Sequence, residues 1–217
     1  MKGLLLKDFA LMKMQKNFFI IILGIAAFIT ILEKNISFPM GFLPVVISLF
    51  TLSTISYDEF DNGNAFLFTL PITRKIYVIE KYCLGILLGF TAWTAGLFIS
   101  SIALLMIQEN SWKTLFLVAF SIFPLIFFLL SVMIPLQLKF GSEKRQLAMF
   151  AVVGTAILLG ILINKIGKSL GFQFHSVMNS LSALSPVVLI GCYILLIFLA
   201  LGISLKISIH VMEQKEF

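Results

Sequence analysis

Charged residues are scarce in this sequence: Asp, Glu, Lys and Arg make up 12% of its 217 residues, whereas 60% are hydrophobic. A soluble domain has about 25% charged and about 45–50% apolar residues, so this composition excludes an ordinary water-soluble globule. Hydrophobic runs of about 20 residues span the hydrocarbon of a bilayer, and six such spans would use roughly 120 residues. The rest of the chain suffices for short loops and leaves no room for a separate soluble domain.

Cysteine and histidine are also rare, with two residues of each. Cys83 and Cys192 lie in apolar stretches without the spacing of metal ligands, so we interpret them as buried free thiols rather than as a disulfide or a zinc site. His175 and His210 are isolated, which argues against the paired histidines of an intramembrane metalloprotease. The sequence therefore predicts no metal site on this chain.

Motifs of known catalytic chemistry are missing as well. No G-x-S-x-G pattern of a serine hydrolase occurs. Residues 167–169 resemble the end of a phosphate-binding loop, but Leu162 stands where such a loop needs its first glycine. Residues 58–69 resemble a calcium loop only superficially, because Phe60 occupies a position that needs an oxygen ligand. We therefore expect a non-catalytic chain.

Six apolar segments are expected to cross the membrane, which makes the chain an all-α integral membrane protein with a single transmembrane domain, residues 1–217. The expected spans are residues 17–32, 36–57, 76–107, 114–138, 147–163 and 183–205. Pro39 and Pro44 in the second span predict a kinked or delayed helix start. Residues 139–146 are expected to form a basic loop, residues 164–182 to lie along the far membrane surface, and residues 206–217 to form a polar tail.

Residues 2–16 precede the first span and mix apolar with charged positions. Leu5, Phe9 and Met12 recur at helical spacing, while Asp8 lies among the polar positions, which predicts an amphipathic helix in the membrane interface. A signal peptide also places lysines before an apolar run. No small-residue cleavage site ends this run, and further spans follow, so we expect the N-terminal segment to be retained.

Positive charges collect on one side of the expected spans. Of 16 Lys and Arg residues, 12 fall on the side of the termini and four on the other, the four being Lys34, Lys113, Lys165 and Lys168. Because cytoplasmic loops are enriched in Lys and Arg, we expect both termini in the cytoplasm. The net charge of +6 then indicates anionic lipid as the partner, and no nucleic acid.

The cores of the expected spans, taken from Tyr82 onward in the third, contain no Asp, Glu, Lys, Arg or His. Ionisable groups within the bilayer usually mark ion pathways or proton relays. Proton-coupled or ion-coupled transport therefore has no evident carrier here, although sodium held by backbone carbonyls alone stays open.

The most distinctive segment lies between the second and third spans, at residues 57–75, which we call the docking segment. Acidic residues crowd its start, two basic residues close it, and an apolar cluster lies between them. The candidate residues are Tyr57, Asp58, Glu59, Phe60, Asp61, Phe66, Leu67, Phe68, Leu70, Pro71, Arg74 and Lys75. An apolar patch rimmed by charge is typical of a docking surface, but insertion of the phenylalanines into lipid headgroups explains the residues equally well. Lys81 and Tyr82 are expected to anchor the next helix at the lipid boundary.

The third span carries small residues at steps of four, three and four: Gly85, Gly89, Ala92 and Gly96. They form a seam along one helix face that allows another helix to approach closely. The partner helix belongs either to the same subunit or to a second subunit of a dimer.

With these features the chain resembles a permease subunit of the ABC-2 type, in the group of short bacterial six-span half-permeases. The matching residues are 1–8 before the first span, Ser56-Tyr57-Asp58-Glu59 at the exit from the second, and 69–75 with Lys81-Tyr82 at the entry to the third. Members of this family pair two six-span subunits with two cytoplasmic ATPase subunits. Their loop between the second and third spans forms a coupling helix that seats in a groove on the ATPase. The resemblance implies that the docking segment lies at that contact.

The resemblance and the uncharged spans together lead to the expectation of an ATP-driven exporter permease in the bacterial cytoplasmic membrane. This chain would bind no cofactor, ATP and Mg²⁺ being held by the partner ATPase, and the second permease would be a copy or a paralogue. The expected cargo is hydrophobic or amphipathic: a modulin-like or bacteriocin-like peptide, a lipid or a drug. The alternatives are a self-contained channel or secondary carrier, or an immunity protein that binds a peptide without transporting it.

Overall fold

The computed structural model describes residues 1–60, 63–107, 112–169 and 186–215, with side chains up to Gly141, at Lys144 and from Tyr193 onward. These residues form helices joined by short turns, and no strand occurs among them. The helices are α1 (Lys2–Met14), α2 (Lys16–Glu33), α3 (Phe38–Glu59), α4 (Gly63–Leu67), α5 (Arg74–Ile107), α6 (Trp112–Ser169) and α8 (Pro186–Gln214). The predicted all-α class is confirmed.

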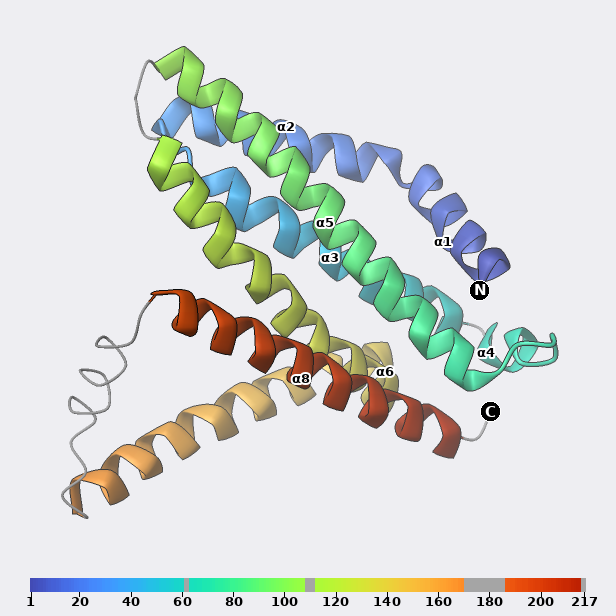
Figure 1. Ribbon diagram of the computed structural model, residues 1–217. Coiled ribbons are helices and arrows are strands. Elements are labelled where there is room, and N and C mark those ends of the chain that lie inside the picture. The colour runs from blue at the N-terminus through green and yellow to red at the C-terminus, as the bar shows by residue number, and fades with distance from the viewer. Residues whose placement is uncertain (61–62, 108–111, 170–185, 216–217) are drawn as a thin grey trace.

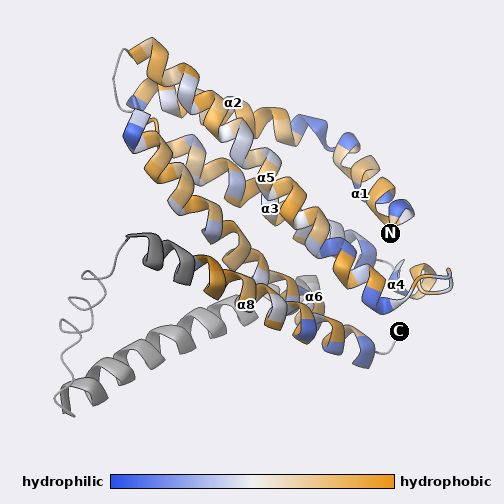
Figure 2. Ribbon diagram, viewed as in Figure 1, coloured by the Kyte–Doolittle hydropathy of each residue, from blue (hydrophilic) through white to orange (hydrophobic). Residues whose placement is uncertain are grey.

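Within the described residues, five helical stretches are long and apolar enough to cross a membrane: Lys16–Glu33, Phe38–Glu59, Arg74–Ile107, Trp112–Gly141 and Tyr193–Gln214. The expected span 147–163 lies in the second half of α6, whose backbone is helical. Residues 170–182 of the expected far-surface segment lie outside the described residues. Figure 2 shows apolar residues along most of α2, α5 and the first half of α6, with hydrophilic residues gathered on α1 and at the ends of α5 and α8 near the termini.

The first two helices meet at a single non-helical residue, Gln15, with φ −99° and ψ 24°. The chain changes direction there, so that α1 does not continue the axis of α2 (Figure 1). The next helix, α3, begins at Phe38 with Pro39 in its first turn, where a missing N–H costs nothing because that group has no intrahelical partner. The helix thus starts two residues after the expected position, and Pro44 lies inside it.

The expected basic loop at residues 139–146 was wrong. Those residues are helical except for Gly141, whose φ of 71° and ψ of −179° lie in a region that is essentially restricted to glycine. This single residue lets the axis of α6 change direction sharply (Figure 1).

The expected polar tail is also largely helical, because α8 continues to Gln214. Met212 is buried in the core and Ser208 is completely buried, so the last turns pack on the protein rather than extending into solvent. Figure 1 places both termini and α4 at one end of the molecule, which we call the terminal end.

The core is divided between two clusters of buried side chains. The first joins α1, α3, α4 and α5 to α6 and α8, and includes Leu4, Ile55, Leu67 and Tyr77 among its members. The second packs α2 against α3 and α5, and includes Ala26, Leu43 and Leu88 among its members. The short helix α4 is therefore part of the folded core on one face and is not a free loop.

The small-residue seam of α5 faces the interior of this chain. A Cβ on Gly85 would lie 2.9 Å from Leu130 Cδ2, and one on Gly89 would lie 2.6 Å from Ile126 Cγ2, both on α6. Gly96 packs on the carbonyl of Pro39, where a Cβ would lie 3.0 Å from the oxygen, and Ala92 is buried at 2% exposure. The seam thus lets α5 approach α3 and α6 within the subunit.

Candidate functional site

A buried group of charged residues lies at the terminal end, where α1, α3 and α5 meet. Lys81 is at its centre: Lys81 Nζ lies 2.5 Å from Asp8 Oδ2, 2.9 Å from Asp58 Oδ2 and 3.2 Å from Thr54 Oγ1. Lys81 and Asp8 are both 0% exposed. One ammonium group therefore connects α5 to both α1 and α3. We call Lys7, Asp8, Asp58, Glu80 and Lys81 the ion cluster.

The N-terminal helix contributes one residue of each sign to the ion cluster. Lys7 forms an ion pair with Asp58 and lies 3.4 Å from the Oδ1 atom of its neighbour Asp8. Tyr77 donates a hydrogen bond to Asp58 Oδ2 at 3.1 Å. Asp58 is therefore held from two helices at once, by Lys7 of α1 and by Lys81 and Tyr77 of α5.

Glu80 is the third carboxylate of the ion cluster and the one with the fewest partners. It is 0% exposed, its Oε2 lies 3.6 Å from Lys81 Nζ, and within the described residues no hydrogen-bond donor reaches either oxygen. Asp8 Oδ1 also accepts no hydrogen bond there. Three carboxylates thus share two ammonium groups, so Glu80 has no ammonium group of its own.

We expect the Glu80→Gln substitution to stabilise the protein. It removes a carboxylate that has no ammonium group of its own, and the new amide supplies donors in a cluster where Asp8 Oδ1 lacks one. A hydrogen bond contributes about 0.5–1.5 kcal/mol, so the melting temperature of the purified protein should rise by about 1–6 °C. The measurement is thermal unfolding in detergent, followed by intrinsic tryptophan fluorescence.

The control for this variant is Glu33→Gln, the same change at the exposed end of α2. It should alter the free energy of unfolding by no more than about 0.5 kcal/mol. A lower melting temperature for Glu80→Gln would show instead that the Glu80 carboxylate is needed beside Lys81.

The docking segment lies at the same end as the ion cluster and exposes part of its apolar run. Phe60 and Phe66 are each 72% exposed and Leu70 is 45% exposed. We call these three residues the docking patch. Tyr57, Pro71 and Lys75 are exposed around it. The exposed part of the segment therefore combines apolar side chains with the polar groups of Tyr57 and Lys75, as in many protein contacts.

Leu67 and Phe68 of the segment turn inward. Leu67 is 8% exposed and belongs to the first core cluster. Phe68 packs edge to face on Tyr77 with 5.8 Å between ring centroids, and the Arg74 guanidinium lies 5.9 Å from its ring centroid. Because α4 is helical, Phe66 and Leu67 point in different directions, so the apolar run divides into an exposed patch and a buried anchor.

The charged residues at the two edges of the segment are attached to the C-terminal end of α8. Lys215 Nζ lies 3.0 Å from Glu59 Oε1, and Gln137 donates to Glu59 Oε2 at 3.3 Å. Arg74 Nη1 donates to the carbonyl oxygen of Glu213 at 2.5 Å. Asp61, the remaining candidate residue, lies outside the described residues.

The expected lipid-boundary role of Lys81 and Tyr82 was wrong. Lys81 is enclosed in the ion cluster, and Tyr82, at 3% exposure, places its hydroxyl 2.5 Å from Ser204 Oγ and 2.9 Å from Ser208 Oγ. Both side chains find polar partners on other helices of the protein, so neither needs the membrane surface. Asp8, expected among the polar positions of an amphipathic helix, is likewise buried.

Sequence reasoning missed the ion cluster as a unit. The sequence indicates this cluster only weakly. Asp8 lies four residues after Leu4, on the same face of its helix. Asp58 follows one long apolar stretch, and Lys81 precedes the next. Complementary charges at the ends of neighbouring spans are candidates for pairing, but the sequence does not show which helices are neighbours.

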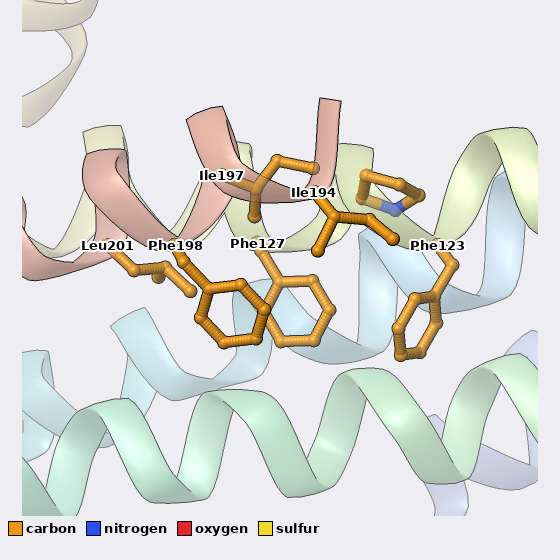
Figure 3. Close-up of a pocket in the computed structure, with 7 residues that line it drawn as sticks. Phe123, Phe127, Ile194, Ile197, Phe198 and Leu201 are labelled. Carbon is orange, nitrogen blue, oxygen red and sulfur yellow. The ribbon is translucent and has the colours of Figure 1, made fainter. Parts of the chain in front are cut away.

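A separate apolar pocket lies between α6 and α8. It is lined by Phe123, Pro124, Phe127, Ile194, Ile197, Phe198 and Leu201. Figure 3 shows the rings of Phe127 and Phe198 side by side, one from each helix, with Phe123 beyond them. Among the described residues, no charged residue and no side-chain hydrogen-bonding group lines this pocket, so it is suited to an apolar group.

The family of the chain follows from a match over nearly its whole length: the family model for ABC-2 family transporter proteins covers residues 3–213. The chain belongs to the ABC-2 transporter family. The resemblance inferred from the sequence is therefore confirmed. Comparison with curated proteins and with solved structures gave no match.

As an ABC-2 family member, the chain is a multi-pass membrane protein and a transporter permease, and the family works with ABC ATPase subunits. Such permeases are typically non-catalytic membrane subunits. The ion cluster of this ABC-2 protein is consistent with a structural role, since Lys81 is buried between Asp8 of α1 and Asp58 of α3 and so joins three helices. The docking patch lies at the same end of the molecule as the ion cluster and consists of exposed apolar side chains.

Proposed function

We propose that this ABC-2 protein is the permease subunit of an ATP-driven exporter in the bacterial cytoplasmic membrane, and that its docking patch binds a cytoplasmic ATPase subunit. The observation that carries the proposal is the division of the docking segment into exposed Phe60, Phe66 and Leu70 and buried Leu67. A buried anchor holds the segment in place, and an apolar patch with exposed polar groups in the same segment is left for a partner.

The complete transporter in this proposal contains two ATPase subunits, which bind ATP and Mg²⁺, and two permease subunits, the second being a copy or a paralogue. Both termini and the docking segment face the cytoplasm. This orientation is supported by the excess of Lys and Arg on that side and by the common location of the termini and α4 in Figure 1.

The proposed cargo is hydrophobic or amphipathic, such as an amphipathic peptide, a lipid or a drug-like molecule. The apolar pocket between α6 and α8 supports this choice, because its lining offers contacts for apolar groups only. The exposed faces of α2 and α8 carry large apolar side chains such as Phe28 and Phe198, which suit contact with lipid.

We expect the double variant Phe66→Ser and Leu70→Ser to lose its ATPase partner. A hot-spot residue of an interface contributes about 2 kcal/mol or more, so if one of the two is such a residue the affinity should fall by more than about tenfold. The measurement is the amount of ATPase that co-purifies with the tagged permease, identified by mass spectrometry as a protein with a phosphate-binding loop and by ATP hydrolysis.

The control variant is Met14→Ser, because Met14 is 82% exposed but lies at the far end of α1, outside the docking segment. It should retain the ATPase. Phe68 is left unchanged, since its ring packs on Tyr77 and a serine there would disturb the fold. The proposal fails if the wild-type permease captures no ATPase, or if the double variant remains folded and captures as much as the wild type.

A further inference from the structure

The ion cluster lies between the docking segment and the N-terminal helix. Asp58 is in the last turn of α3, two residues before Phe60 of the docking patch. Gly63, which begins α4, packs so closely that a Cβ on it would lie 2.9 Å from the carbonyl oxygen of Asp58. Any displacement of α4 toward α3 therefore pushes directly on Asp58.

From Asp58 the contacts continue to α1 by two routes. Asp58 pairs directly with Lys7, and it shares the ammonium of Lys81 with Asp8. The shared ammonium is fully buried, so neither Asp8 nor Asp58 can leave it without leaving a charge unpaired in the interior. These ion pairs therefore couple any movement of the C-terminal end of α3 to a movement of α1.

The N-terminal helix is built so that it can move as one body. It is separated from α2 by the non-helical residue Gln15, so its direction can change at that point. Its face opposite the ion cluster is exposed, with Leu6 at 68% and Phe9 at 46%. Its polar attachment to the bundle is concentrated at Lys7 and Asp8, while Leu4, Leu5 and Met12 pack on the two core clusters and Gln15 donates a hydrogen bond to the Tyr57 hydroxyl at 2.5 Å.

We propose that the ion pairs Lys7–Asp58 and Asp8–Lys81 transmit displacement of the docking segment to α1, with Lys81 as the positioning residue shared by both. The inference rests on the proposed function, because an ATPase on the docking patch is needed to displace the segment. It assigns the ion cluster a role in conformational change and makes α1 a moving element of the permease. The ATPase must bind differently to the two positions of the segment for any movement to follow.

The test compares the nucleotide response of two spin-label pairs in the complete complex of permease and co-purified ATPase in lipid nanodiscs. Cys83→Ser and Cys192→Ser remove the native thiols. One pair uses Leu6→Cys on α1 and the other Thr69→Cys next to α4, each with Lys34→Cys at the opposite end as reference; all three positions are exposed. Distances are measured by pulsed electron paramagnetic resonance with and without ATPγS and Mg²⁺.

In the otherwise unaltered complex we expect both pairs to change distance on nucleotide binding, by on the order of 2 Å or more. With Asp8→Asn the change at Thr69 should persist and the change at Leu6 should be lost, while ATPase capture is unaltered. Lys7→Met, which leaves Lys81 and both of its aspartate partners in place, should reduce the change at Leu6. The matched control Lys13→Met, at an exposed lysine of the same helix, should leave both changes intact.

A conservative variant separates transmission from a general loss of the Asp8 side chain. Asp8→Glu keeps a carboxylate opposite Lys81, and should retain at least part of the change at Leu6 that Asp8→Asn loses. The inference is overturned if Leu6 does not respond to nucleotide while Thr69 does, or if Leu6 responds fully in both Asp8→Asn and Lys7→Met. Absence of a response at Thr69 would instead reject the proposed function, and the inference with it.

Discussion

Replacement of Lys81 by methionine is expected to be among the most destabilising single changes in this protein. Methionine preserves the length of the side chain but removes the ammonium that Asp8 and Asp58 share. Breaking a buried ion pair by removing one partner costs about 3–5 kcal/mol, because the remaining charge stays buried without compensation. We therefore expect Lys81→Met to lower the free energy of unfolding by at least that amount, measured by chemical denaturation in mixed micelles.

The control for Lys81→Met is Lys13→Met, which removes an exposed ammonium and should change stability by no more than about 0.5 kcal/mol. Adding Asp8→Asn and Asp58→Asn to Lys81→Met should recover much of the loss, because the unpaired charges are then removed as well. Equal stability of Lys81→Met and Lys13→Met would mean that the ion cluster contributes nothing to folding.

The helical class and the approximate ends of most helices could be predicted because they depend on local properties of the chain. The first span was expected at residues 17–32, and α2 covers Lys16–Glu33. Apolar length and flanking charge fix such a segment with little help from the rest of the protein. The same holds for α3, whose start is set by Pro39.

What could not be predicted depends on contacts between distant residues. The charges of Asp8 and Lys81 are 73 residues apart in sequence, and each alone looks like a residue for the membrane surface. The tail after residue 205 was expected to be free because its residues are polar, whereas Ser208 meets Tyr82 and Lys215 meets Glu59. Polarity predicts solvent exposure only where no polar partner is brought close by the fold.

The bend at Gly141 shows a third reason why part of the fold could not be predicted from the sequence. The charged residues around it predicted a loop, but charge does not prevent a helix, and the turn needs only one residue with a conformation that glycine can adopt. The docking segment was in turn predicted as a candidate but not divided into its two faces. That division became visible only when Leu67 was found in the core and Phe66 on the surface.

A larger residue in the small-residue seam is expected to have the second large effect. A Cβ on Gly89 would lie 2.6 Å from Ile126 Cγ2, and Ile126 is only 1% exposed, so it has no free space into which to move. Overpacking of this kind typically costs about 1–3 kcal/mol. We expect Gly89→Ala to cost about that amount and Gly89→Val to cost more, both measured as loss of unfolding free energy in mixed micelles.

The matched control is Gly24→Ala on α2, where no atom lies within 4 Å of the added Cβ. Alanine favours a helix over glycine by about 0.8–1.0 kcal/mol, so this variant should be stabilised by up to that amount. If close helix packing decides the outcome, the change from glycine to alanine should lower the free energy of unfolding at position 89 and raise it at position 24. Combining Gly89→Ala with Ile126→Ala should cost less than the sum of the two single changes, because the truncated side chain leaves room for the new methyl group. Strict additivity of the two losses in unfolding free energy would show that contact with Ile126 is not the reason why residue 89 must be small.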